Sequence, residues 1–101
     1  MKARCAVFSR GGLRVAVVGA DLFGMLKSEI DPIEAKLREG GVDHLLFAMS
    51  HNHAAPDSIG IYGSYPKAYV DHIQAQVVKG VPVGRRALPM PGGGLVRAAW
   101  R

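Results

Sequence analysis

Two histidines one residue apart directly follow an apolar stretch, in the segment Ser50-His51-Asn52-His53. If this segment continues a strand, side chains at alternate positions lie on one side, so both imidazoles face the same way. Neutral imidazole is a common zinc ligand, and α/β sheets place their sites beyond the carboxyl ends of strands. The pattern favours a metal site in which His51 and His53 take part.

The same two residues have a second interpretation, as a polar pair in a loop. A catalytic zinc ion usually has three protein ligands, and an H-x-H pair supplies only two of them. The metallo-β-lactamase pattern H-x-H-x-D-H is excluded, because Ala55 stands where its aspartate belongs. His44 and His72 lack metal-site spacing and are interpreted as surface or half-buried residues.

Two aspartates are further candidates for the site. Asp21 ends an expected strand at 13–20, beside the end of the strand that leads to His51, so it could bind substrate or orient a metal ligand. Asp57 follows Pro56 and is a second candidate for substrate binding. Both also fit simple caps of a turn or helix, because aspartate side chains accept hydrogen bonds from nearby backbone amides.

Apolar patterning predicts a small α/β unit of about three strands and two helices. The expected elements are strands at 4–8, 13–20 and 43–49 and helices at 32–39 and 65–79. Glycines between the first two strands favour a hairpin. The order strand, helix, strand that follows predicts a right-handed βαβ crossover with parallel strands.

The last 21 residues differ in composition from the rest of the chain. Residues 1–80 hold nine Lys and Arg against eight Asp and Glu, whereas residues 81–101 hold four Arg and no acid. Three prolines and four glycines leave this segment without strand or helix periodicity, which predicts a disordered tail. Its arginines could attach to a polyanion, but no base-reading motif accompanies them, so no specific nucleic-acid partner is predicted.

Three stretches carry a family resemblance: VAVVGADLFGM, LLFAMSHNHAAPDSIGIYG and YPKAYVDHIQAQVVKGV. They resemble the start of the catalytic domain of the neutral/alkaline non-lysosomal ceramidase family, over about two-thirds of this chain. In that family two apolar strands and a helix lead into a T-H-T-H-S-G-P motif. Both histidines and Pro56 of the motif are present here, while Ser50, Asn52 and Ala54-Ala55 replace the other positions.

The resemblance implies a zinc-dependent amidohydrolase that cleaves the N-acyl linkage of ceramide, a lipid substrate. It implies that His51 binds Zn²⁺ and that His53 is the catalytic residue, in contact with the substrate or its developing negative charge. The family's other ligands lie far downstream, so residues 1–80 are expected to be a fragment of a larger α/β catalytic domain, inactive alone. The alternative is a non-catalytic α/β remnant or interaction module without a complete metal site.

The sequence says less about the compartment of the protein and about its association with other chains. No apolar run reaches the roughly 18 residues of a membrane span, and none forms a signal-peptide core, which makes the cytoplasm the default compartment. The single cysteine, Cys5, permits no internal disulfide and is interpreted as a buried strand residue. An exposed sheet edge is a template for pairing with another chain, so self-association is expected there.

Overall fold

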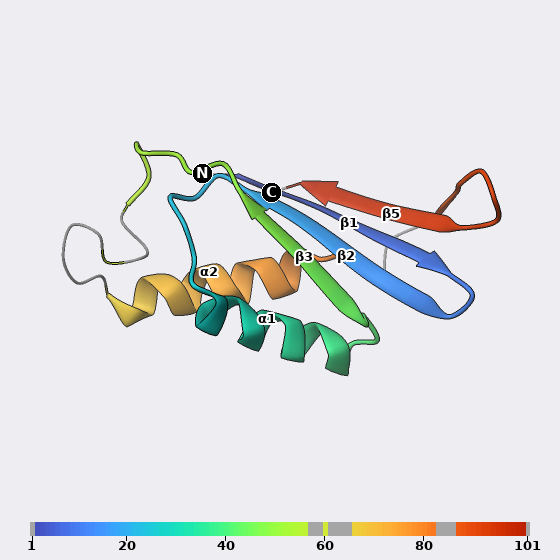
Figure 1. Cartoon of the computed structure of the whole chain (residues 1–101), viewed down its shortest axis with the longest axis horizontal. Coiled ribbons are helices and arrows are strands. Elements are labelled where there is room, and N and C mark those ends of the chain that lie inside the picture. The colour runs from blue at the N-terminus through green and yellow to red at the C-terminus, as the bar shows by residue number, and fades with distance from the viewer. Residues whose placement is uncertain (1, 57–59, 61–65, 83–86, 101) are drawn as a thin grey trace.

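The computed structural model describes residues 2–56, 60, 66–82 and 87–100. Its elements in chain order are β1 (Ala3–Arg10), β2 (Leu13–Ala20), α1 (Lys27–Glu39), β3 (His44–Met49), α2 (Lys67–Gly80), β4 (Leu88–Pro89) and β5 (Leu95–Trp100). Both helices lie on one face of a single sheet (Figure 1). The predicted α/β class is confirmed, with five strands where about three were expected.

The expected hairpin at the start of the chain is present. β1 and β2 pair antiparallel along their full length, with Arg10 opposite Leu13 at the turn. The two turn residues, Gly11 and Gly12, have φ angles of 58° and 84°. A turn with positive φ at both central positions matches the twist of the flanking strands, and glycine adopts these angles without strain.

The expected βαβ unit is also present. β3 lies parallel to β2, with Phe47 opposite Val18, and α1 makes the connection between them. The Asp43 carboxylate at the start of β3 accepts a hydrogen bond from the Arg14 amide at 2.8 Å, while the Asp43 amide donates to the Arg14 carbonyl. This pair of bonds fixes the register at which the parallel strands begin.

Helix α1 is longer than the sequence predicts. It begins at Lys27 and contains Pro32 in its interior, whereas we expected the helix to start at that proline. A proline removes the hydrogen bond to the carbonyl four residues earlier. Here that carbonyl belongs to Ser28, and both residues are exposed, so water can reach the unpaired group. The Glu29 carboxylate caps the first turn by accepting from the Leu26 amide at 3.0 Å.

The structure corrects the prediction of a disordered tail. β5 pairs antiparallel with β1 over six positions, and β4 pairs with the start of β5. The glycine-rich stretch between them is a turn: Gly92 and Gly93 both have a φ of 87°, and the Met90 amide donates to the Gly94 carbonyl at 2.7 Å. These glycines join two strands, so the unusual composition reflects a tight turn and not an unstructured segment.

The sheet order β3-β2-β1-β5-β4 places the first strand at its centre. Inward residues of β1, β2 and β3 pack against the two helices, and Cys5 is buried there as expected. The core comprises Cys5, Val7, Ala16, Val18, Ala20, Leu22, Met25, Ile33, Leu37, Val42, Leu45, Val70, Ile73, Val77 and Val81. Within the described ranges, no helix is long and apolar enough to cross a membrane.

Candidate metal centre

The two histidines lie in a loop that is held against the loop following β2. β3 ends at Met49, and the Ser50 amide then donates to the Ala20 carbonyl at 3.0 Å. The Asn52 amide donates to the Leu22 carbonyl at 3.1 Å. These bonds prolong the contact between the two chain segments beyond the ends of their strands, so the histidine loop has a defined position.

His51 does not continue the strand, so the prediction that strand alternation places both imidazoles on one side is wrong. Its φ angle is 57°, in the left-handed region. Histidine enters this region more often than most residues, at a cost of about 1 kcal/mol. The turn is closed by Asn52, whose side-chain oxygen accepts from the Ala54 amide at 2.9 Å. The turn, and not strand alternation, brings His51 and His53 together.

Phe23 anchors both imidazoles. Its ring stacks on His51 with centroids 4.8 Å apart and meets His53 edge-on at 4.9 Å. The two imidazoles lie 4.6 Å apart, nearly perpendicular to each other. Phe23 is only 3% exposed although both histidines are exposed, so the pair rests on one buried ring.

A backbone carbonyl selects the tautomer of His51. Its Nδ1 atom lies 2.8 Å from the Phe23 carbonyl oxygen. A carbonyl oxygen can only accept, so Nδ1 carries the proton in this bond and neutral His51 keeps its lone pair on Nε2. Protein ligands to metals are typically oriented in this way, by a hydrogen bond on the nitrogen that does not bind the metal. The free nitrogen through which His51 could bind a metal is therefore Nε2.

The structure does not assemble a complete ligand set. In the part of the chain that it describes, no three His, Cys, Asp or Glu side chains gather where they could hold a metal ion. Asp21 is half-buried after β2, where its amide donates to the Lys2 carbonyl at 2.8 Å; its carboxylate does not join the two histidines in such a group. Asp57 lies outside the described residues.

The other two histidines lie on different elements from the pair. His44 is exposed at the opposite end of β3, and His72 is exposed on α2. This agrees with their interpretation as surface residues. The contribution of Phe23 was missed in the sequence, although a large aromatic residue two positions after the aspartate that ends a strand is the signal that could have indicated it.

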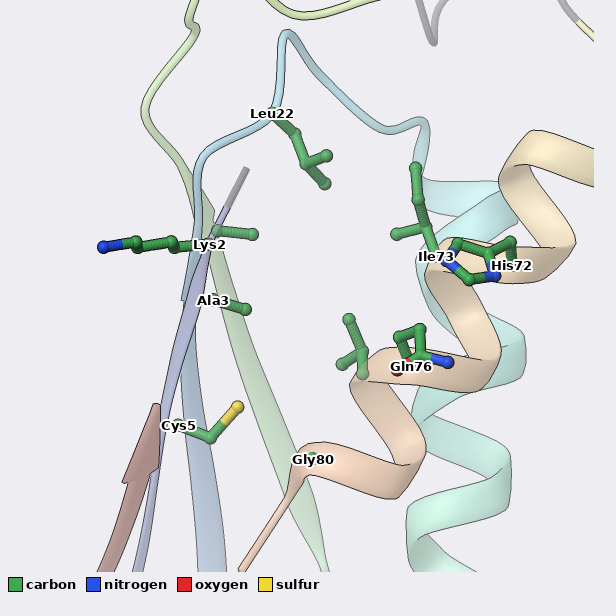
Figure 2. A pocket seen from close by; sticks show the side chains of 10 residues that line it. Lys2, Ala3, Cys5, Leu22, His72, Ile73, Gln76 and Gly80 are labelled. Carbon is green, nitrogen blue, oxygen red and sulfur yellow. The ribbon is translucent and has the colours of Figure 1, made fainter. Parts of the chain in front are cut away.

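A cavity of about 260 Å³ opens between β1 and α2 (Figure 2). Leu22 and Cys5 point into it from one side and Ile73 from the helix, while the Lys2 side chain points away. Small residues leave the space open; they are Ala3 on β1, Ala20 on β2 and Gly80 on α2. Neither His51 nor His53 lines the cavity, so it is separate from the candidate metal centre.

Searches against protein-family models, curated proteins and solved structures found no match for this chain. The ceramidase resemblance accordingly stays a prediction that rests on the motif residues. The geometry of the histidine pair is a second argument for a metal site, and it does not depend on that resemblance.

Proposed function

We propose that this chain carries part of the active site of a zinc-dependent amidohydrolase that resembles neutral ceramidase and cleaves the N-acyl linkage of a lipid-like amide. One observation carries the proposal: the Phe23 carbonyl binds Nδ1 of His51 at 2.8 Å and leaves Nε2 for a metal. His53 lies beside it on the same buried ring, at 4.6 Å between imidazole centroids.

Each residue of the pair has a distinct role in this proposal. His51 holds Zn²⁺ through Nε2, and His53 contacts the substrate or the negative charge that develops on its carbonyl oxygen. A bound zinc ion supplies a water of lowered pKa and polarises the amide carbonyl. Phe23 keeps the two imidazoles at a fixed separation, which positions His53 relative to the metal ligand.

In this proposal the described residues supply only one of the ligands of a catalytic zinc site. Catalytic zinc usually has three protein ligands, whereas this pair supplies one ligand and one auxiliary group. Further ligands would have to come from residues outside the described part or from another polypeptide. The chain is therefore proposed to bind zinc weakly by itself.

We expect His51→Ala to lower the zinc affinity of the chain by at least about tenfold, because the variant loses the oriented nitrogen. His44→Ala and His72→Ala are matched controls, since both histidines are exposed and lie on β3 and α2, outside the loop that carries the pair. Isothermal titration calorimetry with zinc measures all four proteins, and circular dichroism checks that each is folded. Equal zinc affinities in all four proteins would show that the histidine pair is not the zinc site.

The chain alone should not hydrolyse an amide at a measurable rate. Metal catalysis requires a fixed coordination geometry and a shaped, partly dry cavity, and both histidines are exposed. The assay incubates the purified protein and zinc with a short-chain fluorescent ceramide. Zinc-dependent turnover that disappears in both His51→Ala and His53→Ala would contradict this expectation and establish a self-sufficient small hydrolase.

A non-catalytic interaction module is the second candidate function. It is favoured by the face of the sheet opposite the helices, where Phe8, Val17 and Leu46 are exposed. An interaction module and a zinc half-site are compatible within one polypeptide, because the histidine loop lies at one end of the sheet.

A further inference from the structure

Helix α2 presents two different surfaces to the cavity that it shares with β1. The Gln74 side-chain amide donates to the Glu29 carbonyl of α1 at 2.7 Å, which fixes one flank of α2 against its neighbour. The helical period then turns three buried residues toward the sheet; they are Ile73, Val77 and Gly80. His72 and Gln76 lie on the flank away from α1 and are exposed. The cavity thus has an apolar wall toward the sheet and a polar mouth on one flank of the helix.

Small side chains leave this space unfilled. Ala3 on β1 and Ala20 on β2 line it, and Gly80, the last residue of α2, brings no side chain to it. The volume is about 260 Å³, whereas gaps in a packed protein interior rarely exceed the size of one water molecule. The space is therefore too large to be an ordinary packing gap.

The wall of the cavity is apolar, and its polar groups are confined to the mouth. Leu22, Ile73 and Val77 are each no more than 5% exposed, and Cys5 points into the same space (Figure 2). The polar side chains among the described lining residues are all exposed; they are Lys2, His72 and Gln76. Because a buried water needs two to four polar partners, the inner part of this space favours an apolar occupant over water.

The volume and the wall together define the occupant. An engineered cavity of about 150 Å³ with an apolar wall binds benzene, which has six carbon atoms. In proportion, the volume of about 260 Å³ takes about ten non-hydrogen atoms. The described lining residues include no phenylalanine, tyrosine or tryptophan on which an aromatic ligand could stack. An aliphatic chain suits this wall, and a polar head can exchange hydrogen bonds with His72 and Gln76 at the mouth.

We propose that this cavity binds a single-chain amphiphile: an aliphatic chain of about eight to ten carbon atoms with one uncharged polar head, such as a hydroxyl group. The chain lies against Leu22 and Ile73, and the head lies at His72 and Gln76. Neither histidine of the candidate metal centre lines the cavity. Binding therefore requires no zinc, and the failure of either proposal leaves the other standing.

NMR of the full chain with labelled methyl groups tests the proposal, and 1-octanol is the probe. The methyl signals of Leu22, Ile73 and Val77 should shift as the alcohol saturates the site. Those of Val42 and Leu45 should shift far less, because these buried core residues do not line the cavity. The matched probe is 1,8-octanediol, which has a hydroxyl group at each end. It must bury one hydroxyl against an apolar wall, so its affinity should be at least about tenfold lower.

The length of the alcohol measures the depth of the cavity. From 1-butanol to 1-decanol, each added methylene should raise the affinity about fourfold, because one more CH₂ group leaves water. Beyond about ten carbon atoms the cavity is full, and the gain should stop. An affinity that keeps rising at the same rate through 1-dodecanol would indicate adhesion to exposed apolar surface and would overturn the proposal.

Ala3→Leu fills the cavity from β1. It should lower the affinity for 1-octanol at least about tenfold, because the three added carbon atoms take the room of three methylenes. Ala6→Leu is the matched control, since it makes the same change on the opposite face of the same strand, and its affinity should equal that of the parent. The proposal fails if the cavity methyl groups of the parent do not shift, or if a folded Ala3→Leu variant binds 1-octanol as tightly as the parent. If Ala3→Leu does not fold, the chain-length series of the parent decides alone.

Discussion

A chain that ends at Pro82 should lose most of its folding free energy, instead of losing only a loose tail. β5 covers one long edge of the central strand β1 over six paired positions. At about 1 kcal/mol for one hydrogen bond at each of these positions, the removal of β5 costs about 6 kcal/mol, comparable with the whole stability of a small domain. This expectation differs from the one drawn from composition, which predicted a disordered tail at residues 81–101.

Urea denaturation followed by circular dichroism measures the effect of the truncation. The control is a variant with Leu88→Ser and Pro89→Ser, which alters the exposed two-residue strand β4 and leaves β5 in place. Surface changes of this kind usually shift stability by no more than about 0.5 kcal/mol. A truncated chain with the unfolding free energy of the parent would show that β5 contributes nothing to the fold.

Phe23→Ala should affect both stability and zinc binding. Phe23 is 3% exposed, and replacing a buried phenylalanine by alanine costs about 3–5 kcal/mol. The same change removes the ring on which His51 stacks and against which His53 rests. Both imidazoles then lose their fixed orientation, so the zinc affinity of any folded fraction should fall.

Phe23→Leu separates these two effects. Leucine retains an apolar side chain and the backbone carbonyl that binds His51, so the stability loss should stay near 1.5 kcal/mol or less. The aromatic contacts to the histidines are lost. Urea denaturation and zinc calorimetry are the measurements, and nitrogen NMR of His51 reports whether Nδ1 still carries the proton. Unchanged stability in Phe23→Ala would contradict the anchoring role assigned to this ring.

The parts of the fold that sequence predicts well are those set by local signals. The apolar run at 13–20 and the Gly11-Gly12 turn specify β2 and the hairpin without reference to distant residues. The stripe of apolar residues in α2 placed that helix to within two residues at its start. The start of α1 was predicted wrongly, at Pro32 instead of Lys27. Pro32 is tolerated inside the helix because its exposed position removes the usual penalty for an unpaired carbonyl.

β5 was not predictable because its stability is not local. Ala98 and Ala99 have weak strand preference, and Arg97 interrupts the apolar pattern. The strand exists because β1, far earlier in the chain, offers a complete edge for it to pair with. The histidine site shows the same limit: the motif identified His51 and His53, but the left-handed turn and the contact with Phe23 depend on tertiary packing.

The central place of β1 has a consequence for how the chain folds as it is made. β1 leaves the ribosome before its two neighbours and meets β2 almost at once, but its other neighbour, β5, follows about 85 residues later. At typical rates of synthesis, β1 waits for the order of ten seconds with one edge unpaired. During that interval its backbone groups can pair with any nascent chain nearby, so the yield of folded protein should depend on how fast translation delivers the last strand.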